Sequence, residues 1–245
     1  VDGVNLASGQ NITVNGALTL GNDDNFASGH YNPNDKFTPD PDRLTWDTAD
    51  TFGISVSNHL GWTAGAGNGT RIGGGGGYLQ RDFTFDNVHY VGTVNQGITT
   101  GNLTEVTSLT FRNSSWDTSK VNNNFGIAGR ASTTADRLGS LVFDNVWFSQ
   151  QKTSSSTLSG ITDATLNDLR VAGQLVQYTS QFPLAPSGIG TLTTTYTDAN
   201  GHTQNVKAGA LTNGDAWVGA WTGDQTKNNS SDLTLITRNT GTGLM

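Results

Sequence analysis

One short pattern recurs along the chain and constrains its fold more than any other feature. A few residues alternate between apolar and polar side chains, an Asn, Asp or Gly follows, and a second short apolar stretch comes next. The copies begin at residues 12, 54, 83, 109, 141 and 164. Alternation with a period of two is typical of a strand with one buried face, so each copy predicts a β-strand with an apolar inner side.

The polar residues that end the alternating stretches lie far apart. They are Asn58, Asn87, Asn113, Asn145 and Asp168, with spacings of 29, 26, 32 and 23 residues. Strands of a β-sandwich usually recur about every 8–12 residues. Strands spaced two to three times more widely favour a β-solenoid, in which each coil buries its apolar face by stacking on its neighbours. An ordinary β-sandwich is the alternative.

The recurring Asn has a physical role in such coils. At a corner between two strands, Asn adopts the left-handed backbone conformation more readily than other residues with a side chain. Side-chain amides stacked on successive coils can bond one another in a ladder. The predicted ladder residues are Asn58, Asn87, Asn113 and Asn145. The same register predicts that Phe85, Phe111 and Phe143 stack one above another in the interior.

Three segments carry a resemblance to a known fold family. They read Thr-Phe-Asp-Asn-Val at residues 84–88, Thr-Phe-Arg-Asn-Ser at 110–114 and Val-Phe-Asp-Asn-Val at 142–146. This pattern resembles right-handed parallel β-helix proteins, which include pectate-lyase-like enzymes and autotransporter passengers. The resemblance covers roughly residues 1–175 and implies a right-handed parallel β-helix. It implies little about function, because one fold hosts many functions.

The composition supports an all-β chain and excludes several classes of function. Only one of the 20 acidic residues is Glu, and Met occurs once, so strong helix formers are scarce. The net charge of −7 opposes nucleic-acid binding. No apolar run has the length of a membrane span. The chain has no Cys, which excludes disulfides and thiolate metal sites.

The composition also bears on localisation. The chain is rich in Thr, Asn and Gly, begins at Val1, and has its single Met at Met245. A mature chain from which a secretory signal has been removed would have these features, although a shortened chain would look the same at its start. We expect a secreted or cell-surface protein.

We expect two domains. Residues 1–180 would form the β-solenoid, from which an Asp-rich loop at residues 21–50 projects. Residues 61–77, which end in five glycines, would form another loop. Residues 181–245 would form an antiparallel β capping or assembly module. Within it, Asn200-Gly201 between alternating runs predicts a hairpin with a type I′ turn.

The projecting loop is the strongest candidate for a metal site. Ca²⁺ takes about six to eight oxygen ligands, and Asp side chains supply them. The predicted ligands are Asp23, Asp24, Asp40 and Asp42. Their spacing matches no EF-hand, and a solvated acidic loop is the alternative.

Two other groups of residues bear on possible sites. Trp217 and Trp221 are four residues apart, which places them on one face of a strand, where they would bind carbohydrate by stacking. Packing inside the C-terminal module is the alternative. We expect His89, on a repeat strand, at the surface and without a catalytic role.

No catalytic residues are predicted. We expect a secreted cell-surface structural protein, either an adhesin or passenger segment or the subunit of an extracellular fibre, which binds copies of itself or a cell-surface or matrix glycan. Residues 4–6 and 12–20 could pair with a neighbouring subunit. The alternative is a β-helix polysaccharide lyase or hydrolase acting on acidic glycans. A lyase would need calcium at the Asp-rich loop and a base such as Arg71, Arg81 or Arg112.

Overall fold

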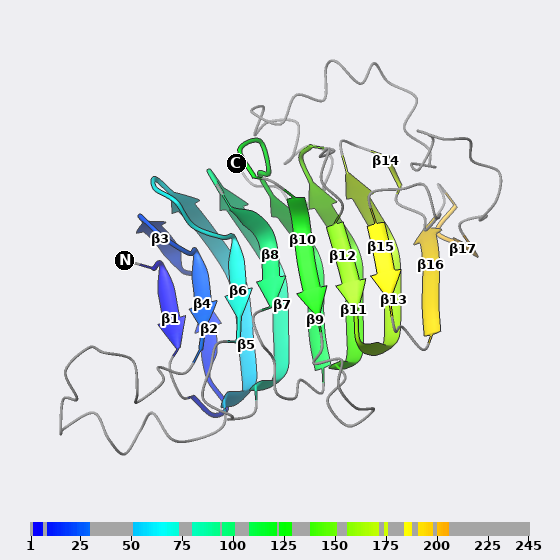
Figure 1. Cartoon of the computed structure of the whole chain (residues 1–245), viewed down its shortest axis with the longest axis horizontal. Coiled ribbons are helices and arrows are strands. Elements are labelled where there is room, and N and C mark those ends of the chain that lie inside the picture. Colours follow the sequence, from blue (N-terminus) through cyan, green and yellow to red (C-terminus); the bar gives the residue numbers. More distant parts are fainter. Residues whose placement is uncertain are drawn as a thin grey trace.

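The protein is all-β, and its strands are stacked along its longest axis (Figure 1). The computed structural model describes residues 2–6, 9–29, 51–73, 80–93, 95–100, 108–121, 123–128, 138–150, 156–171, 174–175, 184–187, 191–197 and 200–205. Every regular element among these residues is a strand, and none of these residues lies in a helix that could cross a membrane.

The strands form two sheets, and the chain alternates between them. The seven-stranded sheet contains, in spatial order, β1 (Val4–Leu6), β4 (Phe26–Ser28), β6 (Thr70–Ile72), β8 (Gln96–Thr100), β10 (Asn123–Ala128), β12 (Ser156–Ser159) and β15 (Leu184–Ser187). The ten-stranded sheet contains β2 (Thr13–Asn15), β3 (Leu18–Gly21), β5 (Thr51–Thr63), β7 (Gln80–Val91), β9 (Ser108–Trp116), β11 (Leu138–Phe148), β13 (Ile161–Val171), β14 (Gln174–Leu175), β16 (Thr191–Thr197) and β17 (Thr203–Asn205).

Neighbouring strands are parallel in both sheets, except where β14 pairs with β13 and β17 with β16. This pairing argues against an ordinary sandwich, whose sheets are antiparallel. We call one strand of the seven-stranded sheet, together with the strands that follow it in the ten-stranded sheet, a repeat unit. The first repeat unit is then β1, β2 and β3, and successive units lie side by side along the stack (Figure 1).

Aromatic side chains run through the core from unit to unit. The strand register places Phe85 opposite Phe111 and Phe111 opposite Phe143, and all three are fully buried. The rings of Phe85 and Phe111 are stacked with centroids 4.9 Å apart, and Phe111 and Phe143 follow at 5.5 Å. A second column continues with Trp116 and Phe148, whose ring centroids are 5.4 Å apart. The interior stack predicted from the three Phe residues is therefore present.

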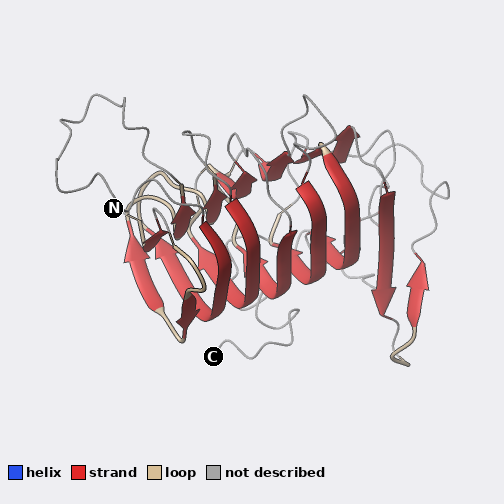
Figure 2. Cartoon of the chain, turned by 90° about the horizontal axis from the view of Figure 1, so that it is seen from below, coloured by secondary structure: helices blue, strands red, loops and turns tan. Residues whose placement is uncertain are grey.

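The long strands of the ten-stranded sheet bend along their length (Figure 2), and each bend contains a residue with positive φ. These residues are Asn58 (51°), Asn87 (55°), Asn113 (49°), Asn145 (54°) and Asp168 (48°), and Gly16 (71°) follows β2 at the same level. Asn, Asp and Gly are the residues that visit the left-handed region most readily. The recurring polar residue of the sequence pattern therefore marks the corner of each strand.

After the corner, the alternation of inward and outward side chains changes its phase. Val88 and Tyr90 both face the core after Asn87, and Val146 and Phe148 do so after Asn145. Residues 61–63, expected in a loop, belong to β5, because the chain continues as a strand past Asn58. Each long strand therefore provides two inward faces, one on each side of its corner.

Parallel pairing continues beyond residue 180, where a separate module is predicted. β15 pairs with β12, and β16 pairs with β13, both in parallel. The antiparallel pairing expected around Asn200-Gly201 joins β16 and β17, with Thr197 opposite Thr203. The two-residue type I′ turn predicted at Asn200-Gly201 is wrong, because that turn would place Thr203 opposite residue 198, whereas Thr203 lies opposite Thr197.

Candidate functional site

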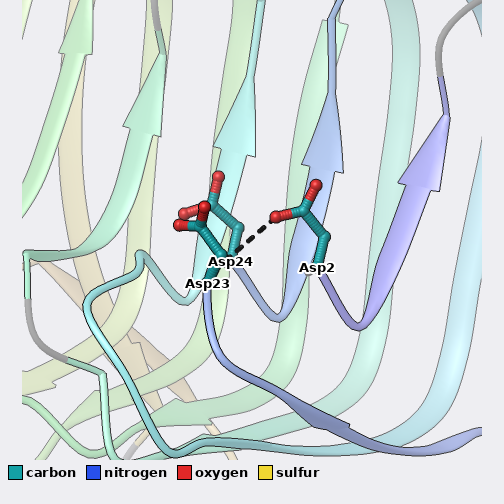
Figure 3. A group of neighbouring side chains, drawn as sticks. All are labelled: Asp2, Asp23 and Asp24. Carbon is teal, nitrogen blue, oxygen red and sulfur yellow. Dashed lines mark hydrogen bonds between the residues drawn. The ribbon is translucent and has the colours of Figure 1, made fainter.

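Three carboxylates meet at the first repeat unit (Figure 3). Asp2 precedes β1, and Asp23 and Asp24 lie in the connection from β3 to β4. Each side chain offers one oxygen, and these oxygens all lie within 4.8 Å of one another. Within the described part of the chain, no other group of three His, Asp or Glu side chains is arranged in this way. We call these three residues the acidic cluster.

The pairing of β1 with β4 brings Asp2 into the cluster. Val4 lies opposite Phe26, which sets Asp2 level with Asp24. The backbone N–H of Gly3 donates to the carbonyl of Asp24 at 2.8 Å, and the backbone N–H of Asp24 donates to Asp2 Oδ1 at 3.3 Å. Sequence reasoning missed Asp2, because its place in the cluster depends on a strand register that the local pattern does not specify.

Asp24 is the buried and best-held member. Its side chain Oδ1 accepts hydrogen bonds from the backbone N–H of Asn68 at 2.6 Å and from Asn68 Nδ2 at 2.8 Å. Its Oδ2 lies 3.9 Å from Nη1 of Arg71, which is largely exposed. Gly67 has no room for a side chain, because a Cβ there would lie 2.2 Å from the carbonyl oxygen of Asp23. Residues 67–71 therefore hold the carboxylate in place.

Burial raises the pKa of Asp24 above its ordinary value. The hydrogen bonds from Asn68 oppose this effect, and the charges of Asp23 and Asp2 add to it. A cation placed among the three carboxylates would remove this unfavourable charge and would find the oxygen ligands that Ca²⁺ prefers. Three carboxylates are fewer than a complete Ca²⁺ shell, so carbonyl groups or water would supply the remaining ligands.

The predicted site residues have different outcomes. Asp23 and Asp24 lie together, as the calcium hypothesis requires. The other predicted ligands, Asp40 and Asp42, lie outside the described residues, as do the predicted carbohydrate-binding residues Trp217 and Trp221.

The corner amides are bonded in two runs rather than one continuous ladder. Three amide-to-amide bonds are present: Asn58 Nδ2 to Asn15 Oδ1 (2.8 Å), Asn87 Nδ2 to Asn58 Oδ1 (2.7 Å) and Asn145 Nδ2 to Asn113 Oδ1 (3.0 Å). Between the runs, Asn113 Nδ2 donates to Asp86 Oδ1 at 2.9 Å instead of to Asn87. The interruption falls where Asn87 Oδ1 is bonded to a histidine.

That histidine, His89, links two neighbouring strands. Its Nε2 lies 2.9 Å from Asn87 Oδ1, and its Nδ1 lies 2.7 Å from Ser115 Oγ. Because the Asn87 oxygen can only accept, Nε2 carries the proton and Nδ1 accepts from the hydroxyl of Ser115. The order of hydroxyl, imidazole and orienting group is that of a catalytic triad. His89 and Ser115 are each only 2% exposed, so the hydroxyl is closed to a substrate.

The surface position expected for His89 is wrong. Val88 and Tyr90 point into the core, and His89 lies between them on the other face of the strand, in one column with Ser115 and Trp147. This column is itself covered, since Trp147 is only 9% exposed. Local alternation predicts the face on which a side chain lies but not whether that face is covered.

A second buried histidine lies near the first repeat unit. His59 Nε2 is 2.8 Å from Thr19 Oγ1, and His59 Nδ1 is 3.0 Å from the hydroxyl of Tyr90. Burial lowers the pKa of His59 and of His89 to about 4, so both are neutral at pH 7. Each histidine therefore joins hydrogen-bonding groups of neighbouring strands without carrying charge.

Three large apolar side chains lie at the surface close to the acidic cluster's end of the stack. Leu18 is 78% exposed, Leu20 is 77% exposed and Trp62 is 56% exposed. Leu20 lies opposite Trp62 in the pairing of β3 with β5. We call these three residues the apolar patch.

Comparison with known proteins finds no relative of this chain. No family model, no curated protein and no solved structure matches the chain. Evidence on function therefore comes from the arrangement of the residues themselves.

Proposed function

We propose that this chain is a secreted cell-surface structural protein, built as a right-handed parallel β-helix, that acts as an adhesin or passenger segment or as the subunit of an extracellular fibre. The alternation of successive strands between two parallel sheets supports a helical winding of the chain. Crossovers between parallel strands are right-handed in nearly all proteins, which supports the hand. The composition, which is rich in Thr, Asn and Gly and poor in Lys and Glu, supports an extracellular location.

One observation carries the proposal: buried apolar columns run from unit to unit without a break. Phe85, Phe111 and Phe143 are fully buried and in register, so each unit is held mainly by the units on either side. Such an arrangement presents an extended, regular surface. The polar networks at His59 and His89 are also buried between strands and support the same structural role.

The proposed partners are copies of this chain or a cell-surface or matrix glycan. Negative-stain electron microscopy of the protein at rising concentration would test the first, and binding to glycan arrays and extracellular matrix would test the second. We expect rods or fibres, or retention on one of these surfaces. Free particles at every concentration, together with no retention, would contradict the proposal.

We further propose Ca²⁺ as a bound ion. The acidic cluster supports it, because three carboxylates with one buried member share a small volume and repel one another without a cation. Calcium would then tie the start of β1 to the connection between β3 and β4. Its effect would be to order the first repeat unit.

A second candidate function, a polysaccharide lyase acting on acidic glycans, is favoured by one contact. The guanidinium of Arg71 lies 3.9 Å from Asp24 Oδ2 and is largely exposed, which sets a cationic group beside the proposed calcium site. Incubation with pectate, alginate and glycosaminoglycans, followed by absorbance of new unsaturated ends near 235 nm, would test this function. Absence of product with and without calcium would exclude it, whereas a calcium-dependent product lost in Arg71→Ala would displace the structural role.

A further inference from the structure

The stack of repeat units begins at an end where the core is only partly covered. The inward residues of the first repeat unit and its flanks are partly buried: Val4, Leu6, Ile12 and Val14. Val56, directly opposite Val14 in the next unit, is fully buried. Interior units are covered on both sides, whereas the described residues cover the first unit on one side only.

The strands of this end also have unpaired edges among the described residues. β1 pairs only with β4, and β2 and β3 pair only with β5. The carbonyl groups of Ala17, just before β3, and of Gly21 accept hydrogen bonds from the backbone N–H groups of Leu60 and Ala64, at 3.0 and 2.8 Å. Because backbone groups alternate in direction along a strand, the N–H and C=O groups of Leu18 and Leu20 point toward the free edge.

The same two leucines form the most exposed part of the apolar patch. Both lie on the outward face of β3, since Thr19 between them points inward to His59. Proteins protect exposed strand edges with charges, prolines or covering segments, because a bare edge pairs readily with another strand. Here the edge carries two large apolar side chains and no charge.

We infer that a second copy of this chain covers this end, with β3 of each copy pairing antiparallel about a twofold axis through Thr19. In this register Leu18 lies opposite Leu20 of the partner subunit, and their outward N–H and C=O groups form a hydrogen-bonded pair. The symmetry repeats this pair on the other side of Thr19. The four leucines and the two Trp62 side chains then form one continuous apolar stripe.

A second copy is the occupant that the molecule itself favours. Neighbouring units in the interior contact each other through inward apolar side chains and the strand edges beside them. The end of the stack presents the same kind of surface without a neighbouring unit among the described residues. A twofold axis lets two such halves cover each other, and it is the commonest symmetry of soluble oligomers. Head-to-tail growth of the ten-stranded sheet by parallel pairing is disfavoured, because β17 already pairs antiparallel with the outer side of β16.

This inference rests on the self-association in the proposed function and names the surface that performs it. Sedimentation equilibrium tests it first, with a monomer of 25.8 kDa and an expected species of twice that mass. Leu18→Lys with Leu20→Lys adds charge to the free edge, and we expect it to weaken dimer formation by about tenfold or more. The matched control, Thr110→Lys with Thr162→Lys, adds the same charge to outward positions of β9 and β13 and should leave the dimer unchanged. A wild-type protein that stays monomeric, or an equal loss in the control, would overturn the inference.

Cysteine pairing tests the register and does not depend on the charged variant folding. The chain has no Cys, so every disulfide must come from introduced residues. Leu18→Cys and Leu20→Cys are made as separate proteins and oxidised under mild conditions, alone and mixed. Directly opposed residues have Cα atoms about 5.5 Å apart, within disulfide range. We expect rapid cross-linking only in the mixture, whereas equal cross-linking of either variant alone would contradict this register.

The two levels of the proposal fail in different ways. Suppose that the Leu18→Lys, Leu20→Lys variant still forms the fibres or dimers of the wild type, and that the mixed cysteine variants do not cross-link. The inferred surface is then wrong, while self-association stands. If the wild-type protein is monomeric and binds no surface or glycan, both levels fail.

Discussion

The first repeat unit and the interior units follow one sequence pattern but differ in burial. Val14 in β2 is partly buried, whereas Val56 and Phe85, which follow it in the same column, are fully buried. On the outward face, Leu18 in β3 is exposed, whereas His89, which follows Leu60 in the same column, is buried. The pattern therefore fixes which way a side chain faces, and the neighbouring units decide how much apolar surface it buries.

Truncation of core side chains should show the largest difference between the two regions. We expect Phe111→Ala to lower the free energy of unfolding by about 3–5 kcal/mol, because it leaves a cavity between the rings of Phe85 and Phe143. Val14→Ala should cost about 1 kcal/mol or less, because that side chain is only partly buried. Urea denaturation measures both. Equal costs for the two variants would mean that the interior is not more tightly packed than the end.

Acid should weaken the protein through the two buried histidines. Their pKa is about 4 in the folded protein, against 6.5 for a histidine exposed to water, so the unfolded chain binds more protons between these values. The free energy of unfolding should therefore fall as the pH drops from about 6.5 to 4, by about 3 kcal/mol for each histidine at pH 4. The raised pKa of Asp24 acts in the opposite direction, because the folded protein holds that proton more tightly.

Urea denaturation at pH 7, 5 and 4 would measure this dependence in the wild type, His59→Gln and His89→Gln. Each variant should lose part of the pH dependence. If both variants kept the pH dependence of the wild type, the pKa values of these histidines would not differ between the folded and unfolded protein. His59 bonds to Thr19 in the first repeat unit, so a smaller loss in His59→Gln than in His89→Gln would indicate that this unit opens locally.

Calcium should stabilise the end of the stack rather than its interior. For an affinity typical of extracellular sites, about 5 mM calcium adds about 1–2 kcal/mol to the free energy of unfolding and raises the melting temperature. Magnesium should do less, because it requires stricter octahedral geometry. Asp23→Asn should abolish the effect, and Asp163→Asn, an exposed carboxylate on β13, is the matched control. Identical melting in chelator and in calcium would leave the acidic cluster as a solvated group of charges.

The corner amides should contribute less than the aromatic core. Asn145 combines a positive φ of 54° with a hydrogen bond from its Nδ2 to Asn113. Asn145→Ala should cost about 2 kcal/mol, because it removes the bond and places Ala in the left-handed region. Asn145→Gly removes the bond but tolerates the conformation, so it should cost about 1 kcal/mol. If Gly were as costly as Ala in thermal or urea denaturation, backbone conformation would not be the reason for Asn at this corner.

Sequence alone predicts much of the repeat structure, because its signals are local. Alternation predicts the strands, and the spacing of the anchors predicts that Phe85, Phe111 and Phe143 share a column. Positive φ at Asn58 and Asn87 follows from the special place of Asn in the left-handed region.

The candidate site is less predictable, because it depends on contacts between distant residues. Asp2 joins Asp24 only through the register of β1 with β4, and no local signal reports that register. His89 is buried because the outer face of its column is covered, which alternation cannot reveal. Likewise, β5 continues past its corner to Thr63, although the sequence predicted a loop from residue 61.

Amide hydrogen exchange at low and high protein concentration tests the central comparison most directly. Backbone N–H groups of the interior strands β7, β9 and β11 should exchange slowly at both concentrations, because both edges of each strand are paired. The N–H groups of Leu18 and Leu20 should exchange rapidly in the dilute monomer and become protected when a second copy pairs with β3. Equal exchange of these two groups at both concentrations, or exchange in β9 as fast as in β3, would contradict the account.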